Sequence, residues 1–394
     1  MDFVVPAAIA WYLTATNVTQ WHPPFRSPYA GELSLDPHGR TEETSDLTLY
    51  ASTPLWRGGE LALTAEIDQG HGVGDGVGIA GYPSGEAKIG ANRPYLHLPR
   101  LFVRQTGEDV IFTVGRFSVA DIFDANAYAH DPRGDFLNYA VFEAGAFDYA
   151  SDPWGFTNGA AVEWTHAAWT LRGGAFQLPR TANARITARV DFGAYMLAAE
   201  LERRYTLADR PGKIKLLGFV DRARMGRYRD ALDLARQRGG APDLGLVRRD
   251  TSKAGAIANL EQEISPTFGV FARASANDGE IEAYEYTEIN RSLVAGFQLK
   301  GQCWGRSEDT VGFAVAVNAL SRAARDYFAA GGLGIVIGDG ALNYRTEQIV
   351  ETYYAWRVEK HVAITFDVQH VRNPAYNADR GPVNLLAVRS HIEF

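Results

Sequence analysis

The sequence predicts an all-β protein, a transmembrane antiparallel up-and-down β-barrel of about 16 strands with a long central loop folded inward. Three observations favour this class. Segments with apolar residues at every second position recur along the chain. Short and long connections alternate between these segments. The chain also ends on an alternating segment whose last residue, Phe394, is aromatic.

Composition and charge limit the classes of protein to which the chain can belong. The chain has 394 residues, a net charge of -8, 46% hydrophobic residues and 12% aromatic residues, which is enough for a large folded domain. This mildly acidic balance excludes nucleic-acid binding through bulk positive charge. Cys303 is the single cysteine, so no intramolecular disulfide can form.

No apolar run approaches the roughly 18 residues that a transmembrane helix needs. The nearest run, Phe3 to Leu13, follows Met1 and Asp2 without a basic residue before it. A signal peptide begins with a basic region. We therefore interpret this run as the start of a mature chain from which the export signal is absent, and we expect the chain to reside in the bacterial outer membrane.

The clearest strand signals lie near the N-terminus. Leu47 and Leu49 share one face of a segment whose other face carries Thr48, and Glu66 and Asp68 lie opposite apolar residues in the next segment. The expected strands are 11–21, 47–55, 61–67, 100–105, 110–117, 156–164, 169–177, 190–205, 214–222, 254–264, 268–275, 293–300, 311–318, 348–358, 362–371 and 383–394.

The connections carry more information than the strands. Long ones are expected at 22–43, 70–97, 118–155, 178–189, 225–251, 277–290, 320–347 and 372–382, and short ones between them, as at 54–58 and 106–109. In an up-and-down barrel every second connection lies on the same rim. The alternation therefore predicts one rim of tight turns and one of long loops, as in outer-membrane barrels.

The strand faces favour the same class. The polar parity would line an aqueous lumen, while the apolar parity would face outer-membrane lipid, where an unpaired charge is costly. Closure would remove the exposed edges of the sheet. The polar set is Glu66, Asp68, Arg172, Glu200, Glu202, Asp221, Arg273, Asp367 and Arg389.

The C-terminal segment alternates on the same pattern. Leu386, Val388 and Ile392 share a parity with the terminal Phe394, and Arg389 takes the other. This end resembles the final strand by which the barrel-assembly machinery recognises outer-membrane proteins, so we expect that machinery to be a partner during biogenesis.

The segment 115–149, GRFSVADIFDANAYAHDPRGDFLNYAVFEAGAFDY, shows no sustained alternation yet is rich in aromatic and charged residues. A connection this long inside one domain is functional or disordered, and its aromatic content argues against disorder. Within a single barrel domain spanning 1–394, we therefore expect 118–155 to form a pore-constricting loop.

A sugar presents hydroxyl groups that donate and accept hydrogen bonds, and C–H faces that pack on aromatic rings. A selective channel would need polar side chains and rings that bind it weakly enough to release it. The candidate solute-binding residues are Asp121, Phe123, Asp124, Tyr128, His130, Asp131, Arg133 and Asp135. The candidate pore-wall residues are Glu66, Asp68, Arg104, Arg172 and Arg273.

Plainer roles stay open for the loop. Its aspartates can cap turns or pair with Arg133 to hold the loop against the wall. Asp121, Asp124, His130 and Asp131 have the donor types of a Mn or Ca site. Their spacing matches no established binding loop, so no metal ligand is assigned.

Several stretches resemble the carbohydrate-selective porins, the OprB-like family. The central one is VGRFSVADIFDANAYAHDPRGDFLNYAVFEAGAFDYASDPWGFTNGAAVEW, and the others are LFVRQ (101–105), ELERRY (200–205), NLEQ (259–262) and NPAYNADRG (373–381). The resemblance implies a sixteen-stranded barrel that passes sugars passively. The first strand and the short turn RQTGEDV (104–110) depart from the family pattern.

Other functions remain alternatives. A channel for divalent cations such as Mn, or a general non-selective porin, would share the fold. A barrel hydrolase needs a nucleophile beside a base, and the sequence has no nucleophile-elbow motif, so we expect neither catalysis nor a cofactor. The segment 228–238 has helical spacing, which predicts a short helix within a loop. The glycine-rich segment 70–81 lacks the closing Gly-Lys-Ser/Thr of a phosphate loop, so it does not predict nucleotide binding. Monomer and homo-oligomer both stay open.

Overall fold

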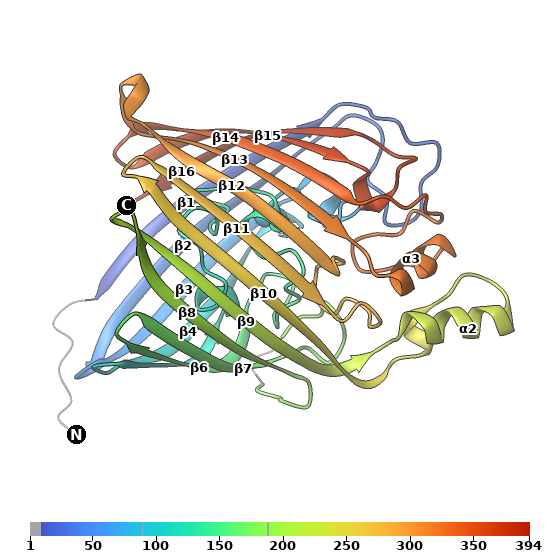
Figure 1. The fold of residues 1–394 in the computed structure, drawn as a ribbon, viewed down its shortest axis with the longest axis horizontal. Coiled ribbons are helices and arrows are strands. Elements are labelled where there is room, and N and C mark those ends of the chain that lie inside the picture. The colour runs from blue at the N-terminus through green and yellow to red at the C-terminus, as the bar shows by residue number, and fades with distance from the viewer. Residues whose placement is uncertain (1–8, 89, 187–188) are drawn as a thin grey trace.

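A computed structural model describes residues 9–88, 90–186 and 189–394. Residues 3–8 of the apolar N-terminal run lie outside the described residues. Within the described chain sixteen antiparallel strands close into a barrel in which each strand pairs with its sequence neighbours and β16 pairs with β1 (Figure 1). The predicted fold class is confirmed.

The strands are β1 (Ala10–His22), β2 (Arg40–Trp56), β3 (Gly59–Gly70), β4 (Ala91–Thr106), β5 (Val110–Phe117), β6 (Thr157–His166), β7 (Trp169–Gln177), β8 (Tyr195–Leu207), β9 (Arg210–Met225), β10 (Arg249–Ser265), β11 (Phe268–Asn277), β12 (Arg291–Gly301), β13 (Arg306–Ala319), β14 (Glu347–Glu359), β15 (Val362–Arg372) and β16 (Val383–Glu393). The helices are α1 (Tyr139–Phe142), α2 (Tyr228–Arg238) and α3 (Arg322–Ala329), with 3-10 turns η1 (Val73–Gly76), η2 (Gly85–Lys88), η3 (Val119–Asp121), η4 (Leu244–Leu246), η5 (Gln302–Trp304) and η6 (Pro374–Tyr376).

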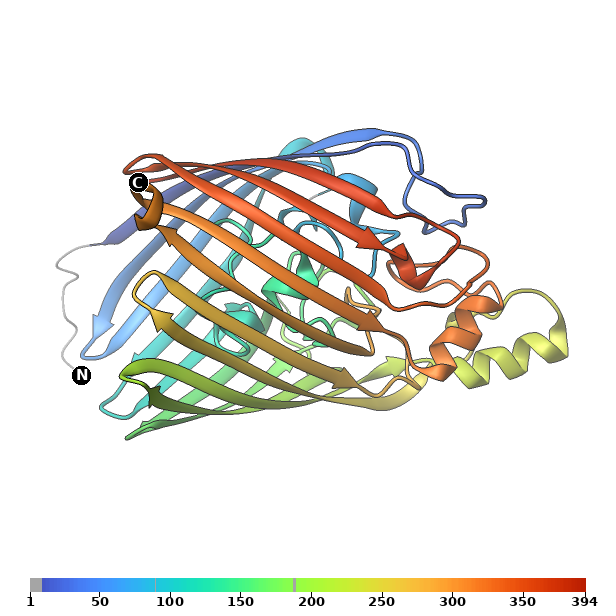
Figure 2. The same cartoon turned by 45° about the horizontal axis from the view of Figure 1, so that its top comes forward.

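The two rims differ as the sequence predicts. One carries tight connections, such as 57–58 between β2 and β3 and 208–209 between β8 and β9. The other carries the long loops, and α2 and α3 project from that end, away from the C-terminus (Figure 2). The helix predicted at 228–238 is confirmed as α2.

The outer surface of the barrel is apolar. Leu47 and Leu49 on β2 are each 41% exposed, whereas Thr48 between them is 3% exposed. Phe112 and Val114 on β5 are likewise exposed. A continuous apolar outer face is what a barrel in lipid presents. None of the helices in the described ranges is long and apolar enough to cross a membrane.

Strand β4 begins at Ala91, inside the connection expected at 70–97, so that predicted connection is too long. A β-bulge explains the error. Arg100 pairs with Thr64 while His97 pairs with Glu66, so β4 has one more residue than β3 in this stretch. The bulge changes the parity of the alternation, which hides the strand from a period-two search.

The long connection between β5 and β6 folds into the barrel and fills much of its interior, as the blue-green coil inside the strands shows (Figure 1, Figure 2). Phe123, Phe136 and Phe147 from this connection are completely buried. They pack on inward-facing wall residues such as Phe176 and Phe271, at ring-centroid distances of 5.9 Å from Phe123 and 5.6 Å from Phe136. The core of the protein is therefore this central loop, residues 118–156, against the inner wall.

Candidate pore and its constriction

Backbone N–H groups of the central loop are held by side chains of the barrel wall. A loop without regular structure carries donors that must find acceptors once they are buried. The wall supplies them on four different strands. The acceptors and their donors are Glu200 with Asp124 (2.9 Å), Glu261 with Ala127 (2.8 Å), Ser275 with Ala146 (3.0 Å) and Glu351 with Leu137 (2.5 Å).

A buried ion pair fixes the middle of the loop. Arg273 on β11 and Asp124 are 1% and 0% exposed at their side chains, and Nε of Arg273 lies 3.2 Å from Oδ2 of Asp124. The same guanidinium donates to the loop carbonyls of Ala129 (2.7 Å) and Val141 (2.9 Å). The sequence assigns Arg273 to the pore wall, where its charge would face solvent. In the structure Arg273 is buried and anchors the loop.

Between the loop and the wall formed by β1 to β4 and β16 lies a cavity of about 1000 Å³. It is bounded by aromatic rings and by charges of both signs. Its aromatic lining is Tyr12, Tyr50, Tyr82, Phe102, Phe142, Tyr149, Trp154, Phe156 and Tyr286, and its titratable polar lining includes Asp75, Glu86, Arg100, Arg104, Asp121, His130, Asp131, Arg133, Glu143, His391 and Glu393. The cavity therefore lies to one side of the barrel.

One charge pair stands at the loop edge of this cavity. Arg100 on β4 binds Asp121 through two nearly parallel hydrogen bonds, of 2.8 Å from Nε and 2.6 Å from Nη2. Burial raises the pKa of the Asp121 carboxyl, but the Arg100 guanidinium more than offsets this and the pKa is lowered overall. Both side chains are 25% exposed, so this geometry places an ionised, bidentate pair at the edge of the cavity.

Arg133 brings a second arginine to the cavity. Its guanidinium lies 3.4 Å from a carboxylate oxygen of Asp46, 3.4 Å from one of Glu66 and 3.6 Å from one of Glu86. These wall and loop carboxylates are nearly inaccessible, whereas Arg133 is 21% exposed. The charge facing the cavity at this point is therefore positive, with negative charge directly behind it.

The rings gather around Tyr82, which stacks on Tyr139 with centroids 4.7 Å apart and meets the edge of Tyr286 at 6.3 Å. Elsewhere on the cavity Arg100 lies over the ring of Phe156, 4.8 Å from its centroid. The aromatic rings offer apolar faces and the arginine offers hydrogen-bond donors, close enough together for one small solute to contact both.

The candidate loop residues separate into two groups. Asp121, His130, Asp131 and Arg133 border the cavity. The others do not, for physical reasons: Phe123 and Asp124 are 0% exposed because they anchor the loop. Asp135 is turned to the wall, where it accepts a hydrogen bond from Gln298 (2.7 Å), and Tyr128 lines a separate cavity of about 600 Å³ near the tight-turn rim.

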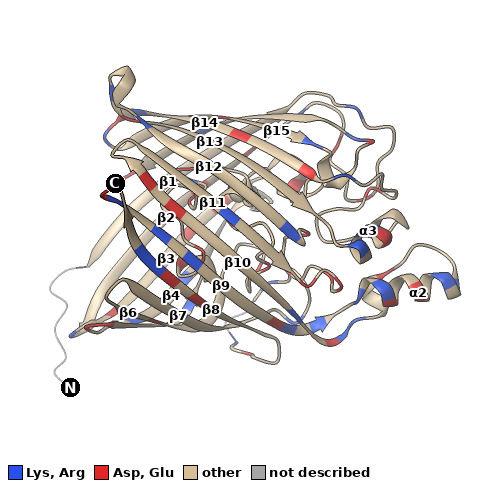
Figure 3. Cartoon of the chain, viewed as in Figure 1, with Lys and Arg blue, Asp and Glu red and all other residues tan. Residues whose placement is uncertain are grey.

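The predicted wall residues also divide. Arg104 borders the main cavity, but Glu66 and Asp68 are only 3% and 0% exposed. Arg172 lies in a network with Glu163 (2.9 Å), Glu200 (2.7 Å) and Glu202 (2.9 Å); Figure 3 shows both signs of charge on neighbouring strands here. The inner polar face is mostly covered because the loop lies against it.

Metal ligation by the loop is not supported by this arrangement. Asp121 is paired with Arg100, and Asp124 with Arg273, so cations of the protein occupy the positions that a metal would take. In the described part of the chain, the loop set Asp121, Asp124, His130 and Asp131 forms no group of three clustered ligand atoms.

Sequence reasoning missed several cavity residues. Tyr12 and Tyr50 pair across β1 and β2 and stack with centroids 4.8 Å apart; their shared inward parity was a usable signal. Arg100 opens the predicted strand 100–105 and shares the inward parity of Arg104, so the same signal was available for it. Tyr82 and Trp154 come from long loops, and no local pattern places them.

Comparison with known proteins agrees with this architecture. The family model for the carbohydrate-selective porin, OprB family, matches residues 33–394. The structure of OprB from Pseudomonas putida at high pH is similar over 98% of this chain and 94% of that one, with a TM-score of 0.78 and 15% sequence identity.

The outer-membrane channel DcaP of Acinetobacter baumannii is similar over 98% of this chain and 97% of that one, with a TM-score of 0.59 and 11% identity. A search of curated sequences found no match. Since the family model covers nearly the whole barrel, the chain belongs to the carbohydrate-selective porin (OprB) family and is a channel of the bacterial outer membrane.

Proposed function

We propose that this channel lets small hydrophilic solutes, preferentially carbohydrates, diffuse passively through the cavity between the central loop and the wall of β1 to β4. The observation that carries the proposal is the composition of that cavity. Aromatic rings from the wall and from three long loops stand beside the Arg100–Asp121 pair and Arg133.

This composition suits a neutral polyhydroxylated solute. Hydroxyl groups of a sugar can accept hydrogen bonds from guanidinium groups and donate to carboxylates, while its C–H faces pack on Tyr82, Trp154 or Phe156. The arginines are already paired with carboxylates. A paired charge binds a neutral polar group without attracting a counter-ion strongly, which favours release as well as entry.

A channel for Mn is less well supported. A cation path needs uncompensated carboxylates or carbonyls along the passage. Here the Asp121 and Glu86 carboxylates that border the cavity are already paired with Arg100 and Arg133, so less of their negative charge is left to attract a divalent cation. A general porin differs from a sugar channel only in whether solutes of equal size pass at different rates.

The test is solute flux through the purified full-length chain in liposomes, with glucose, a disaccharide, an amino acid and Mn²⁺ at matched gradients. We expect glucose to enter faster than an amino acid of similar size, and Mn²⁺ to enter slowest. Equal rates for solutes of equal size would replace the proposal with a general porin, and preferred Mn²⁺ entry would replace it with a cation channel.

Replacing Trp154 by Ala tests the aromatic contribution. Loss of one ring contact worth about 1 kcal/mol weakens sugar binding by about fivefold, so glucose should lose much of its advantage over the amino acid. Trp164→Ala is the matched control, because Trp164 faces outward from β6 and is 46% exposed. An equal effect of the two substitutions would count against sugar contact at Trp154.

A further inference from the structure

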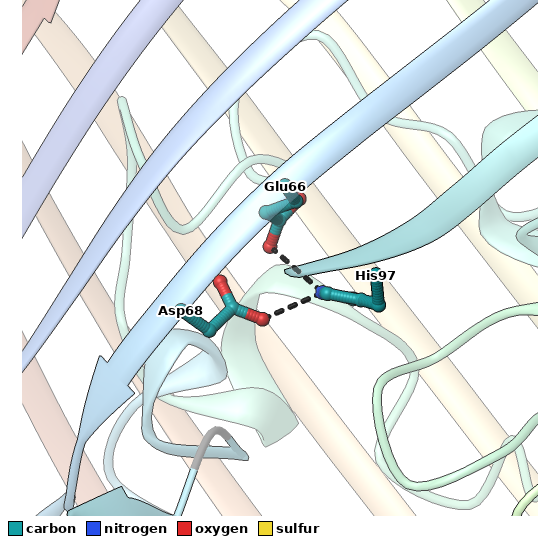
Figure 4. Close-up of side chains that lie close together, drawn as sticks. All are labelled: Glu66, Asp68 and His97. Carbon is teal, nitrogen blue, oxygen red and sulfur yellow. Dashed lines mark hydrogen bonds and ion pairs between the residues drawn. The ribbon is translucent and has the colours of Figure 1, made fainter. Parts of the chain in front are cut away.

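We propose that Glu66, Asp68 and His97 form a binding site for a divalent transition-metal ion on the inner wall of the barrel. The two carboxylates lie two residues apart on β3 and share its inner face, and His97 is the β4 partner of Glu66. Figure 4 shows the three side chains converging. One ligand atom from each lies within 4.8 Å of the others.

The distances are close to those of a metal centre. Nε2 of His97 lies 2.6 Å from Oδ2 of Asp68 and 3.9 Å from Oε1 of Glu66. Ligands that each lie about 2.0–2.2 Å from a metal are about 3.0–3.5 Å from one another. The first distance is that of a hydrogen bond and is shorter than this range, whereas the second distance is longer and the three atoms span up to 4.8 Å. An ion would therefore replace the hydrogen bond, separating His97 from Asp68 and drawing Glu66 closer.

The remaining oxygen of Asp68 gives independent support. Asp68 is completely buried, and its Oδ1 has no hydrogen-bond partner. Figure 4 shows that the other oxygen of Asp68 is the one directed at His97. Burying a carboxylate oxygen without a partner is costly, and a cation at this point would remove the cost.

The surroundings are rich in carboxyl groups. Asp46, the cross-strand partner of Asp68, and Glu86 are also nearly inaccessible, and both lie beside Arg133, whose guanidinium is 3.4 Å from Glu66. The carboxyl groups of Asp46, Glu66, Asp68 and Glu86 thus lie close together around Arg133 and the imidazole of His97, and such a concentration of oxygen ligands suits a cation.

The β4 bulge and two aromatic rings build the site. In a regular strand, residues three positions apart face opposite sides of the sheet. The bulge lets both His97 and Arg100 face inward. The His97 ring is 5.7 Å from the rings of both Tyr95 and Trp154, centroid to centroid. These contacts fix the imidazole and separate the site from the main cavity, which Trp154 lines.

The donor set selects the kind of ion. An imidazole nitrogen with two carboxylates favours first-row transition metals such as Zn²⁺ and Mn²⁺ over Ca²⁺ and Mg²⁺, which prefer oxygen ligands alone. The Irving–Williams order places Zn²⁺ above Mn²⁺. All three ligands bind only when deprotonated, so binding should weaken as the pH is lowered.

The experiment is equilibrium dialysis of the purified full-length chain in detergent, freed of metal with a chelator, against Zn²⁺, Mn²⁺ or Ca²⁺ alone. We expect one tightly bound Zn²⁺ per chain, weaker Mn²⁺ and the weakest binding for Ca²⁺. His97→Gln should lower the Zn²⁺ affinity about tenfold or more, and Asp68→Asn should do the same.

His71→Gln is the matched control. His71 also contacts an aspartate, with Nδ1 2.9 Å from Oδ1 of Asp75, but this pair is more exposed and belongs to no three-ligand group among the described residues. Its Zn²⁺ binding should equal that of the parent chain. Heat-dependent gel mobility would verify that each variant keeps its barrel. Absence of stoichiometric Zn²⁺ in the parent chain, or unchanged binding in folded His97→Gln, would overturn the proposal.

Discussion

Replacing Arg273 by Met should release the middle of the central loop. The substitution keeps the aliphatic bulk but leaves the buried carboxylate of Asp124 without its cation, and the carbonyls of Ala129 and Val141 without a donor. Removing one partner of a buried ion pair costs about 3–5 kcal/mol. At about 1.4 kcal/mol per factor of ten, the population with a detached loop should rise by roughly two to three and a half orders of magnitude.

Two measurements report this population. Amide hydrogen exchange across 118–156 should lose protection by the same factor while the strands keep theirs. Single-channel conductance should rise and become noisier, because the loop fills much of the barrel interior (Figure 1, Figure 2). In the double variant Arg273→Met with Asp124→Asn, protection should partly return, since no charge is then buried alone. Asn also tolerates the left-handed backbone of Asp124, whose φ is 56°.

Arg180→Met is the matched control for this prediction. Arg180 also binds an aspartate, Asp191, at 2.7 Å, but the two side chains are 64% and 35% exposed. An exposed pair contributes about 0–1 kcal/mol, so loop exchange and conductance should stay unchanged. Unaltered exchange in Arg273→Met, or an equal loss in Arg180→Met, would refute the assignment of Arg273 as the anchor.

Two further substitutions probe charge at the cavity and in a neighbouring loop. Asp121→Asn leaves Arg100 with an unpaired charge at the passage, so the reversal potential in a KCl gradient should shift toward anion preference; no shift would place Arg100 outside the ion path. Burial raises the pKa of Glu288 from 4.5 to about 7. The free energy that Glu288 contributes to keeping its loop docked is therefore fully present below pH 4.5, and it falls by about 3 kcal/mol as the pH rises through 7. The backbone amides of 335–337 donate to Glu288, so their protection from hydrogen exchange should decrease from pH 5 to pH 8 after correction for intrinsic exchange. Glu288→Gln should abolish that decrease. A pH-dependent loss of protection that persists in Glu288→Gln would exclude this carboxyl as its source.

The barrel itself was readable from the sequence because its signals are local. Period-two alternation depends on residues a few positions apart, and the lengths of successive connections depend only on where strands end. Both signals failed where geometry departs from regular pairing. The bulge in β4 concealed the strand from Ala91 onward, and β8 begins at Tyr195 although apolar residues from Val190 onward extend the pattern.

The site was less readable because polarity does not reveal the partner of a side chain. Asp121 and Asp124 are three residues apart in one loop, yet Asp121 borders the cavity and Asp124 is sealed against Arg273. Inward parity was right for Arg273, but parity cannot distinguish a side chain that faces water from one that a loop covers. That difference depends on contacts between segments separated by over a hundred residues.

The distribution of wall carboxylates explains why the passage is off-centre. Glu200 and Glu261 on β8 and β10 accept loop N–H groups, so they hold the loop against that side of the barrel. The opposite wall contributes Tyr12 and Tyr50 to the cavity, which keep that side open. Because an irregular loop must bring its buried N–H groups to acceptors, the positions of acceptors on the wall determine where the loop lies. The position of the cavity therefore depends on strand residues that do not line it, as well as on those that do.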